Sequence, residues 1–397
     1  MSVFNTNKSA SAYSSNNRVK FIRGGKAYFD LLEKIIREAK EIIHLQVYIF
    51  DEDDTGRTIA GALKAAAQRN VRVYVMADGY ASQSMSTSFV RQMTDSGINF
   101  RFFEPVFKTT NFYFGRRMHH KVIVADNEIA MVGGINISNH YNDFHGKPAW
   151  LDFALLTEGA IVKELCALCW KTWNGNKQTT VLEQCNPSGL HGLEPTKDSF
   201  GLVDVRMRRN DWVRRKSQIS KTYIEMMLGA HSHITILCSY FLPGNIMQKT
   251  IKRAVKRGVK IKVIMAGKSD LVVAKNAERF MYDWLLRNKV EIYEYEDNIL
   301  HGKIAVCDSK WMTIGSYNVN DISAYASIEL NLDVNNAIFA KHVEQTMDEI
   351  IANDCLAITR EIHSHSKNIL RQFFRWISYE FFRLSFNVFT FYFKQRS

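Results

Sequence analysis

The stretch His301-Gly-Lys-Ile-Ala-Val-Cys-Asp308, which continues to Gly315-Ser-Tyr-Asn318, decides how this chain is built, because it has a twin. The twin is His119-His-Lys-Val-Ile-Val-Ala-Asp126, which continues to Gly133-Gly-Ile-Asn136. In both copies the His, Lys, Asp, Gly and Asn keep the same spacing, and the second set lies 182 residues after the first. One such match could arise by chance, but two with the same continuation indicate an internal repeat.

The residues between each His and its Asp form short apolar runs, 122–125 and 304–306, that predict strands. Residues two apart on a strand share a face, so each copy presents an imidazole and an ammonium side by side. Asn136 and Asn318 follow one strand and a turn later. If the two sets of His, Lys and Asn surround one point, they form a site suited to binding and cleaving a phosphodiester. The lysines and amides would neutralise its oxygens, one imidazole would attack phosphorus, and the other would protonate the leaving alkoxide.

For one copy alone, a satisfied strand histidine and a solvated lysine would be the simpler interpretation. The repeated pair favours a site. By this repeated motif, the sequence resembles the phospholipase D superfamily and, within it, bacterial cardiolipin synthases, over roughly residues 17 to 350. The likeness extends beyond the repeated motif to Arg117 and to the segments Tyr48–Gly56, Trp150–Asp152, Tyr240–Pro243, Tyr293–Tyr295 and Ser327–Asn331.

The resemblance implies roles for individual residues. Asp152 and Glu329 would be the acids that orient the catalytic histidines, with His119 as nucleophile and His301 as acid and base. Asn136, Asn318, Ser316 and Arg117 would bind the substrate phosphate. The catalytic motif set would be His119, Lys121, Asp126, His301, Lys303 and Asp308, of which the two aspartates would be largely structural. This chemistry would require no metal and no cofactor, because the lysines and amides carry the charge stabilisation.

By the same resemblance we expect a phosphatidyltransferase that makes cardiolipin from phosphatidylglycerol, and from another lipid alcohol as possible acceptor, through a covalent phosphohistidine. The alternative is a phosphodiesterase of the same superfamily that hydrolyses phospholipid or nucleic acid, because the motif fixes phosphodiester chemistry rather than substrate. Nucleic acid is disfavoured as a partner by the aromatic C-terminal tail and by the segment Tyr48–Gly56, both typical of lipid synthases. The pattern leaves the oligomeric state open.

The 397 residues, 46% of them apolar, suffice for two domains with packed cores. Helical patterns at 27–39 and 58–69 alternate with strand patterns at 42–50 and 71–76, which favours an α/β layer with a mostly parallel sheet. The second half repeats this plan, and turn formers cluster at 186–195. We therefore predict two homologous phospholipase D-type α-β-α sandwich halves related by a pseudo-twofold axis, at residues 18–186 and 196–360. Residues 1–17, rich in Ser and Asn, would be disordered.

The formal charge of +12 predicts an anionic partner, either a nucleic acid or an acidic membrane. Part of it lies in the basic segment 206–216 around Trp212, which could be a solvated charged face or a rim that meets lipid headgroups. Six scattered cysteines, at 166, 169, 185, 238, 307 and 355, indicate reduced core thiols in a cytosolic setting.

The tail, residues 361–397, is dense in Phe between 369 and 393, and Arg371, Arg375 and Arg383 fall on one arc of a helical wheel. Its longest uncharged run is ten residues, too short to span a bilayer. It predicts an amphipathic helix in the membrane interface that binds anionic phospholipids such as phosphatidylglycerol. The alternative is a helix that packs on the protein's own core or on a second copy. With the tail in the membrane interface, the protein would be peripheral on the cytoplasmic face of the cell membrane.

Overall fold

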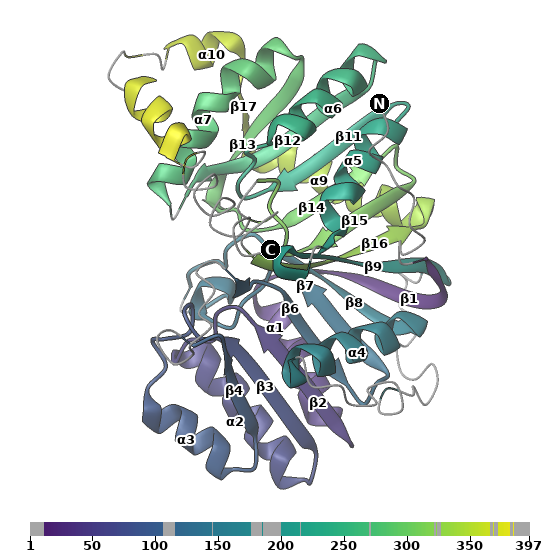
Figure 1. Cartoon of the computed structure of the whole chain (residues 1–397), viewed down its shortest axis with the longest axis vertical. Coiled ribbons are helices and arrows are strands. Elements are labelled where there is room, and N and C mark those ends of the chain that lie inside the picture. Colours follow the sequence, from purple (N-terminus) through teal and green to yellow (C-terminus); the bar gives the residue numbers. More distant parts are fainter. Residues whose placement is uncertain are drawn as a thin grey trace.

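The computed structural model describes residues 12–105, 116–144, 146–175, 185, 200–214, 216–269, 271–320, 323, 327–365, 368, 372–381 and 384. They form two lobes, the first half of the chain in one and the second half in the other, which adjoin at the middle of the molecule (Figure 1).

The first half contains strands and helices in alternation, followed by a run of strands. Its elements are β1 (Ser14–Arg23), α1 (Lys26–Glu38), β2 (Ile42–Val47), α2 (Asp54–Gln68), β3 (Arg72–Asp78), α3 (Thr87–Asp95), β4 (Asn99–Phe103), β5 (Arg117–Met118), β6 (Lys121–Ala125), β7 (Ile129–Gly133), β8 (Phe153–Gly159) and α4 (Ala160–Asn174).

The second half repeats this order. Its elements are β9 (Val203–Asp211), β10 (Lys216–Ser217), α5 (Gln218–Gly229), β11 (His233–Cys238), α6 (Asn245–Lys256), β12 (Lys260–Lys268), α7 (Val272–Arg287), β13 (Val290–Ile299), β14 (Lys303–Cys307), β15 (Trp311–Gly315), β16 (Ser327–Asn335), α9 (Ala337–Asp354), β17 (Cys355–Ala357) and α10 (Arg360–His365).

The strand pairings give both halves the same sheet. The order is β4-β3-β2-β6-β7-β8-β1 in the first half and β13-β12-β11-β14-β15-β16-β9 in the second. Strands β1 and β9 pair with each other in antiparallel orientation, which joins the two sheets at equivalent edges. This arrangement agrees with the predicted pseudo-twofold relation of two homologous halves.

Helices cover both faces of each sheet. In the first half α1, α2 and α3 share one core with β2 and β3, while α5 and α6 do the same with β11 and β12 in the second. The opposite faces carry α4 and α9, and here a single core takes side chains from both halves, such as Val122 and Val132 with Ile304 and Ile314. The fold class, two α-β-α halves, is confirmed, and the shared core explains why the halves are held as one body.

The prediction of a mostly parallel sheet was wrong. Only β2-β3-β4 and β11-β12-β13 run parallel within the large sheet, and the strands that carry the motif are antiparallel. The reason is a tight turn after each motif strand, where Asp126 and Asn127, and likewise Asp308 and Ser309, take left-handed backbone conformations with φ between 52° and 57°. Such a turn returns the chain directly as a hairpin instead of through a crossover helix.

The predicted disordered N-terminus is corrected at its end, because β1 begins at Ser14. Asn17 is fully buried, and its amide donates to the Val203 carbonyl at 3.3 Å while its oxygen accepts from the Ile161 backbone at 2.8 Å. It therefore bridges β1, β9 and the start of α4. Residues 1–11 lie outside the described residues.

The expectation that all cysteines are reduced is also corrected. Cys166 on α4 and Cys185 form a disulfide with a Cα–Cα distance of 5.8 Å. Cys169, three residues after Cys166 in the chain, is a free buried thiol. Cys166 and Cys185 are 19 residues apart and belong to no recognisable cysteine motif, so their spacing did not predict the disulfide.

The basic segment is not a solvated face. Arg208 is 1% exposed and, like Arg206, it pairs with Asp333 on the neighbouring strand and with Glu225 on α5. These arginines are therefore part of the packing between β9, β16 and α5 and do not form a headgroup-facing rim. Arg215 lies outside the described residues.

Candidate active site

Each motif histidine lies directly before a buried central strand, and its backbone is tied to the opposite half. The amides of His119 and His120 donate to the Ile328 carbonyl, both at 3.0 Å. In the second half the amides of His301 and Gly302 donate to the Leu151 carbonyl at 2.8 and 2.9 Å. The same crossed backbone contact therefore occurs twice, once for each copy.

The side chains repeat this crossing. His119 Nδ1 lies 3.0 Å from Oε2 of Glu329 in the second half, and His301 Nδ1 lies 2.6 Å from Oδ2 of Asp152 in the first half. Both carboxylates are buried. A carboxylate on Nδ1 fixes the tautomer and leaves Nε2 for chemistry. Each imidazole is thus positioned by the half to which it does not belong.

Buried surroundings set the protonation of this cluster. Burial lowers the pKa of His119, with Glu329 acting in the opposite direction, and burial followed by the Lys303 charge lowers the pKa of His301 to about 4. Burial alone would raise the pKa of Asp152 and Glu329, but the hydrogen bonds and charges of their histidines lower it overall. Both imidazoles are therefore neutral and both carboxylates charged at neutral pH.

The two lysines begin β6 and β14 and are almost fully buried. Lys121 Nζ donates to the His119 carbonyl at 2.5 Å and lies 5.2 Å from the centre of the Tyr48 ring. Lys303 Nζ donates to Ser239 Oγ at 3.1 Å and to the His301 carbonyl. Burial lowers the pKa of Lys121 to about 7.

The crossed carboxylate contacts, His119 with Glu329 and His301 with Asp152, place the two half-sites next to each other. Lys303 lowers the pKa of His119 in the first half, and Lys121 lowers that of His301 in the second. The structure thus brings together both histidines, both lysines and both orienting acids at the interface of the lobes. Among the described residues no hydrogen bond engages the Nε2 atom of either imidazole, so two imidazoles and two ammonium groups can act on one phosphodiester.

The residues expected to bind phosphate all have protein partners. Asn136 accepts from the Ile49 amide at 3.1 Å and donates to the Tyr141 hydroxyl at 2.9 Å, while Asn318 accepts from the Cys238 thiol at 3.6 Å. Ser316 donates to Glu329 Oε2, behind His119. Arg117 contacts Asp78 Oδ1 at 3.4 Å and the Glu104 carbonyl at 3.2 Å.

The motif aspartates are not brought into the cluster. Asp126 follows the far end of β6 and accepts from the amides of residues 40–42 at 2.8 to 2.9 Å. Asp308 accepts from the amides of residues 231–233 at the same distances. Each holds the start of a neighbouring strand, so the geometry gives both the structural role that the resemblance implied.

Sequence reasoning missed several neighbours of the histidines. Tyr48 packs edge-on against the His119 ring at 4.8 Å, and Tyr141 packs edge-on against the His301 ring at 5.1 Å. Ser239 contacts Lys303 as described above. Tyr48 and Ser239 each follow the strand that pairs with a motif strand, and this shared position is a signal that an alignment of the two halves would have given.

Comparisons with known proteins show the family to which this chain belongs. The family described as "Cardiolipin synthase, PLD-like domain" matches residues 32–145 and 223–351. Cardiolipin synthase B of Escherichia coli K12 is 31% identical over 347 residues, which cover 87% of this chain and 83% of that protein. Cardiolipin synthase 1 of Bacillus anthracis is 27% identical over 372 residues, covering 90% and 72%.

Among solved structures, the phosphatidylserine synthase of Haemophilus influenzae Rd KW20 has the same fold, with a TM-score of 0.71 and 14% identity over 95% of this chain and 96% of that one. The match to the family covers more than half of the chain and includes both copies of the motif. The chain is therefore an enzyme of the phospholipase D superfamily and belongs to its family of cardiolipin synthase-like phosphatidyltransferases.

Proposed function

We propose that this protein makes cardiolipin from two molecules of phosphatidylglycerol. The observation that carries the proposal is the pair of crossed histidine–carboxylate contacts, His119 with Glu329 and His301 with Asp152, in a chain related to cardiolipin synthases. Two oriented imidazoles supply one nucleophile and one acid, which a transfer through a covalent intermediate requires.

In the first step, His119 Nε2 attacks the phosphorus of phosphatidylglycerol. The bond from phosphorus to the glycerol headgroup breaks, glycerol leaves with a proton from His301 Nε2, and a phosphatidyl-histidine forms. In the second step, His301 removes the proton from the headgroup hydroxyl of a second phosphatidylglycerol, whose oxygen displaces His119. The balance is two phosphatidylglycerol molecules converted to one cardiolipin and one glycerol.

The assignment of His119 as nucleophile rests on the resemblance, because the two half-sites have the same reacting groups. The low pKa of both histidines keeps the attacking imidazole neutral. The imidazole that protonates glycerol gains its proton when the anionic phosphate enters, because a nearby negative charge raises the pKa of a histidine. Lys121 and Lys303 stabilise the phosphate oxygens, and we include Asn136 and Asn318 as amide donors that exchange partners on binding.

We further propose that the protein docks on a membrane surface. Apolar side chains are exposed at the N-terminal ends of α6 and α7, for example Ile246 at 64% and Val272 at 70%. Helix 372–381 adds Phe374 at 59% and Phe381 at 60%. Exposed large apolar side chains are typical of a contact site, and α6 follows β11, after which Ser239 contacts Lys303 of the active site.

Helix 372–381 corrects one expectation about the tail. Arg375 was expected among lipid headgroups, but it is only 6% exposed, and Tyr379 next to it packs on Phe280 of α7 at 4.9 Å. The helix thus packs on the protein through a partly polar face and exposes its aromatic face. Arg371 and Arg383 lie outside the described residues. Within the described part of the chain, no helix has both the length and the apolar character needed to cross a bilayer.

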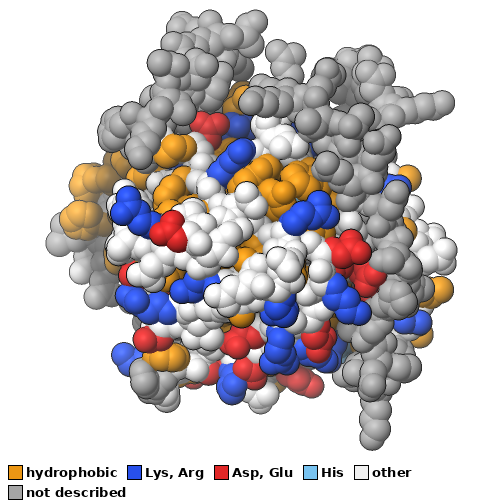
Figure 2. All heavy atoms as spheres, turned by 90° about the horizontal axis from the view of Figure 1, so that it is seen from below, with side chains coloured by type: hydrophobic (Ala, Val, Ile, Leu, Met, Phe, Trp, Pro, Cys, Tyr) orange, Lys and Arg blue, Asp and Glu red, His pale blue; other side chains and the backbone are white. Residues whose placement is uncertain are grey.

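Charge on the surface does not contradict a lipid substrate. On the end of the molecule seen in Figure 2, basic side chains alternate with acidic ones, so the net positive charge is not gathered there into a single basic patch. We propose a peripheral position on the cell membrane. The Cys166–Cys185 disulfide argues against the predicted cytoplasmic face, because disulfides are rare in cytosolic proteins.

The decisive experiment is incubation of purified protein with phosphatidylglycerol vesicles, read by lipid mass spectrometry. Cardiolipin with an equal amount of glycerol is expected, and a His119→Ala variant should give neither. Phosphatidic acid alone would show a hydrolase instead, and cleavage of single-stranded DNA without lipid turnover would show a nuclease. For docking, Phe374→Ser with Phe381→Ser should reduce sedimentation with the vesicles, while Leu202→Ser, an exposed apolar residue elsewhere, should not.

A further inference from the structure

We propose that a second anion site, distinct from the histidine cluster, lies between the two lobes and binds a ligand that carries a phosphate group. It is a cavity of about 280 Å³ that we call the arginine pocket, after its lining residues Arg101, Arg116, Arg209 and Arg214. The inference of this site does not depend on the proposed transfer reaction.

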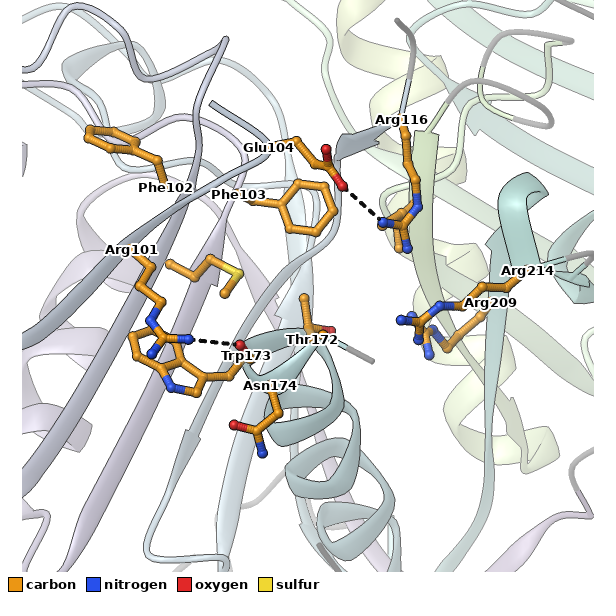
Figure 3. Close-up of a pocket in the computed structure, with 13 residues that line it drawn as sticks. Arg101, Phe102, Phe103, Glu104, Arg116, Thr172, Trp173, Asn174, Arg209 and Arg214 are labelled. Carbon is orange, nitrogen blue, oxygen red and sulfur yellow. Dashed lines mark hydrogen bonds and ion pairs between the residues drawn. The ribbon is translucent and has the colours of Figure 1, made fainter. Parts of the chain in front are cut away.

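Several elements bring these arginines to one place. Arg101 belongs to β4, Arg209 to β9, and Arg116 precedes β5, while the C-terminal end of α4 closes the pocket with Trp173. Figure 3 shows the guanidinium groups of Arg116, Arg209 and Arg214 directed toward the same space. The pocket is therefore built from both halves of the chain.

The pocket holds more positive than negative charge. In the part of the chain that the structure describes, its two carboxylates come from Glu104, which lines it, and from Asp211 beside it. The ion pairs are long: Arg116 lies 3.3 Å from each carboxylate, and Arg214 lies 3.8 Å from Asp211. Strong guanidinium–carboxylate bonds measure about 2.7 to 2.9 Å. Among the described residues, four guanidinium groups thus face two carboxylates, and the contacts of Arg116 and Arg214 with them are longer than strong ion pairs.

Arg209 is the most unusual of the four. Its side chain is 4% exposed, and within the described part of the chain its Nε atom has no hydrogen-bond partner and its guanidinium forms no ion pair. The buried Nε of Arg116 has no hydrogen-bond partner there either. Burying a cation without a partner costs free energy, and the pKa of Arg209, lowered to about 10 mainly by burial, reflects this cost. A bound anion would remove it.

The chemistry of the lining selects the ligand. Guanidinium groups donate in forks that match phosphate oxygens, and donors that converge from several elements suit a tetrahedral anion better than a planar carboxylate. Arg101 is oriented by the Trp173 carbonyl at 3.2 Å and by the Trp173 ring at 4.4 Å. The volume lies just below the range of about 300 to 1,000 Å³ usual for small-molecule sites. It therefore admits a phosphate or a lipid headgroup but not two acyl chains.

The pocket lies on the opposite side of β16 from the histidines. Successive residues of a strand point to opposite faces, and on β16 Glu329 contacts His119 while the preceding Ile328 lines the pocket. Leu330, on the same face as Ile328, is paired in register with Arg209. A ligand here is thus separate from the reacting phosphate but adjoins the strand that orients His119.

The test is calorimetric titration of the full-length protein carrying both His119→Ala and His301→Ala, which removes the reacting imidazoles and prevents turnover, so that sensitivity to the pocket arginines identifies the site that binds. The probes are inorganic phosphate, glycerol 3-phosphate and dihexanoyl-phosphatidylglycerol, with sodium chloride at equal ionic strength as reference. We expect one site per chain, weakened at least tenfold by Arg209→Gln and by Arg214→Gln and unchanged by Arg72→Gln, an exposed arginine at the start of β3.

Tighter binding of the short-chain lipid would identify a headgroup as the natural ligand, and binding of the two soluble phosphates alone would identify a free phosphate ester; both support the site. If Arg209→Gln does not fold, Arg101→Gln, whose side chain is exposed, carries the test together with Arg214→Gln. Binding that is insensitive to these variants, absent from the histidine double variant, or no tighter than chloride would overturn the proposal. Because the titration needs no turnover, it is independent of whether the protein makes cardiolipin.

Discussion

The two half-sites contain the same reacting groups but hold them with different neighbours. In the first, Lys121 lies over the ring of Tyr48; at the equivalent place in the second, Lys303 is hydrogen-bonded to Ser239. Glu329 is held by Ser316, whereas Gly134 stands opposite the shorter Asp152. The two copies of the repeat therefore share the imidazole and the ammonium group but differ in the residues that contact these groups and their orienting carboxylates. A symmetric motif can in this way serve a reaction in which one histidine attacks and the other transfers protons.

Removing either imidazole should separate the two roles most clearly. We expect His119→Ala and His301→Ala each to lower kcat by about 10⁴-fold or more, because nucleophile and acid act as a unit. With phosphorus-labelled phosphatidylglycerol, His301→Ala should retain a trace of labelled protein and His119→Ala none, as measured by acid-labile, base-stable phosphohistidine after quenching. Label found on His301 in the wild type would reverse the assignment.

The crossed carboxylates should show the next largest effect. Glu329→Gln and Asp152→Asn keep size but lose the charge that fixes the histidine tautomer, so we expect kcat to fall by about 10²- to 10⁴-fold. Asp333→Asn is the matched control, because Asp333 lies on the same strand as Glu329 but pairs with Arg206 at 2.8 Å, away from the histidines. If that control lost as much activity at unchanged folded fraction, the two acids would have no special role.

Exchanging the residues behind the acids tests whether the asymmetry matters. A Cβ atom at Gly134 would lie 2.5 Å from Asp152 Oδ1, so Gly134→Ser should displace this carboxylate and lower kcat by about tenfold or more. Ser316→Gly, which removes one hydrogen bond to Glu329, should cost less. Gly61→Ser, where an added Cβ meets nothing within 4 Å, serves as control. Equal losses at 134 and 316 would argue that the two acids are held equivalently.

The pKa values of the site predict how kcat/KM depends on pH. At neutral pH this dependence changes the rate less than the substitutions above. In the free protein the attacking histidine must be neutral and Lys121 charged. Because burial lowers the pKa of His119 below its usual value and that of Lys121 to about 7, kcat/KM should rise with pH on the acid side as His119 loses its proton and fall above about pH 7 as Lys121 loses its charge. Lys121→Arg should move the alkaline limb upward, because a guanidinium keeps its charge. An unchanged alkaline limb in this variant would assign that limb to another group.

Much of this protein follows from the sequence alone. The repeated His-x-Lys spacing identified both half-sites, and the alternation of helix and strand patterns predicted two α/β halves, because periodicity records which face of an element is buried. Asp152 and Glu329 were expected as orienting acids, yet the sequence did not say which acid serves which histidine. Sheet direction was mispredicted, because apolar runs mark strands without recording how the turns between them return the chain.

The tertiary structure decided what depends on contacts between distant residues. Only the packing of the two halves crosses Glu329 to His119 and Asp152 to His301, at separations of 210 and 149 residues. The same packing pairs Cys166 with Cys185 and gathers the four arginines of the pocket from both lobes. Local patterns specify what each segment can become, whereas the pairing of β1 with β9 and the shared core between the sheets specify which segments meet.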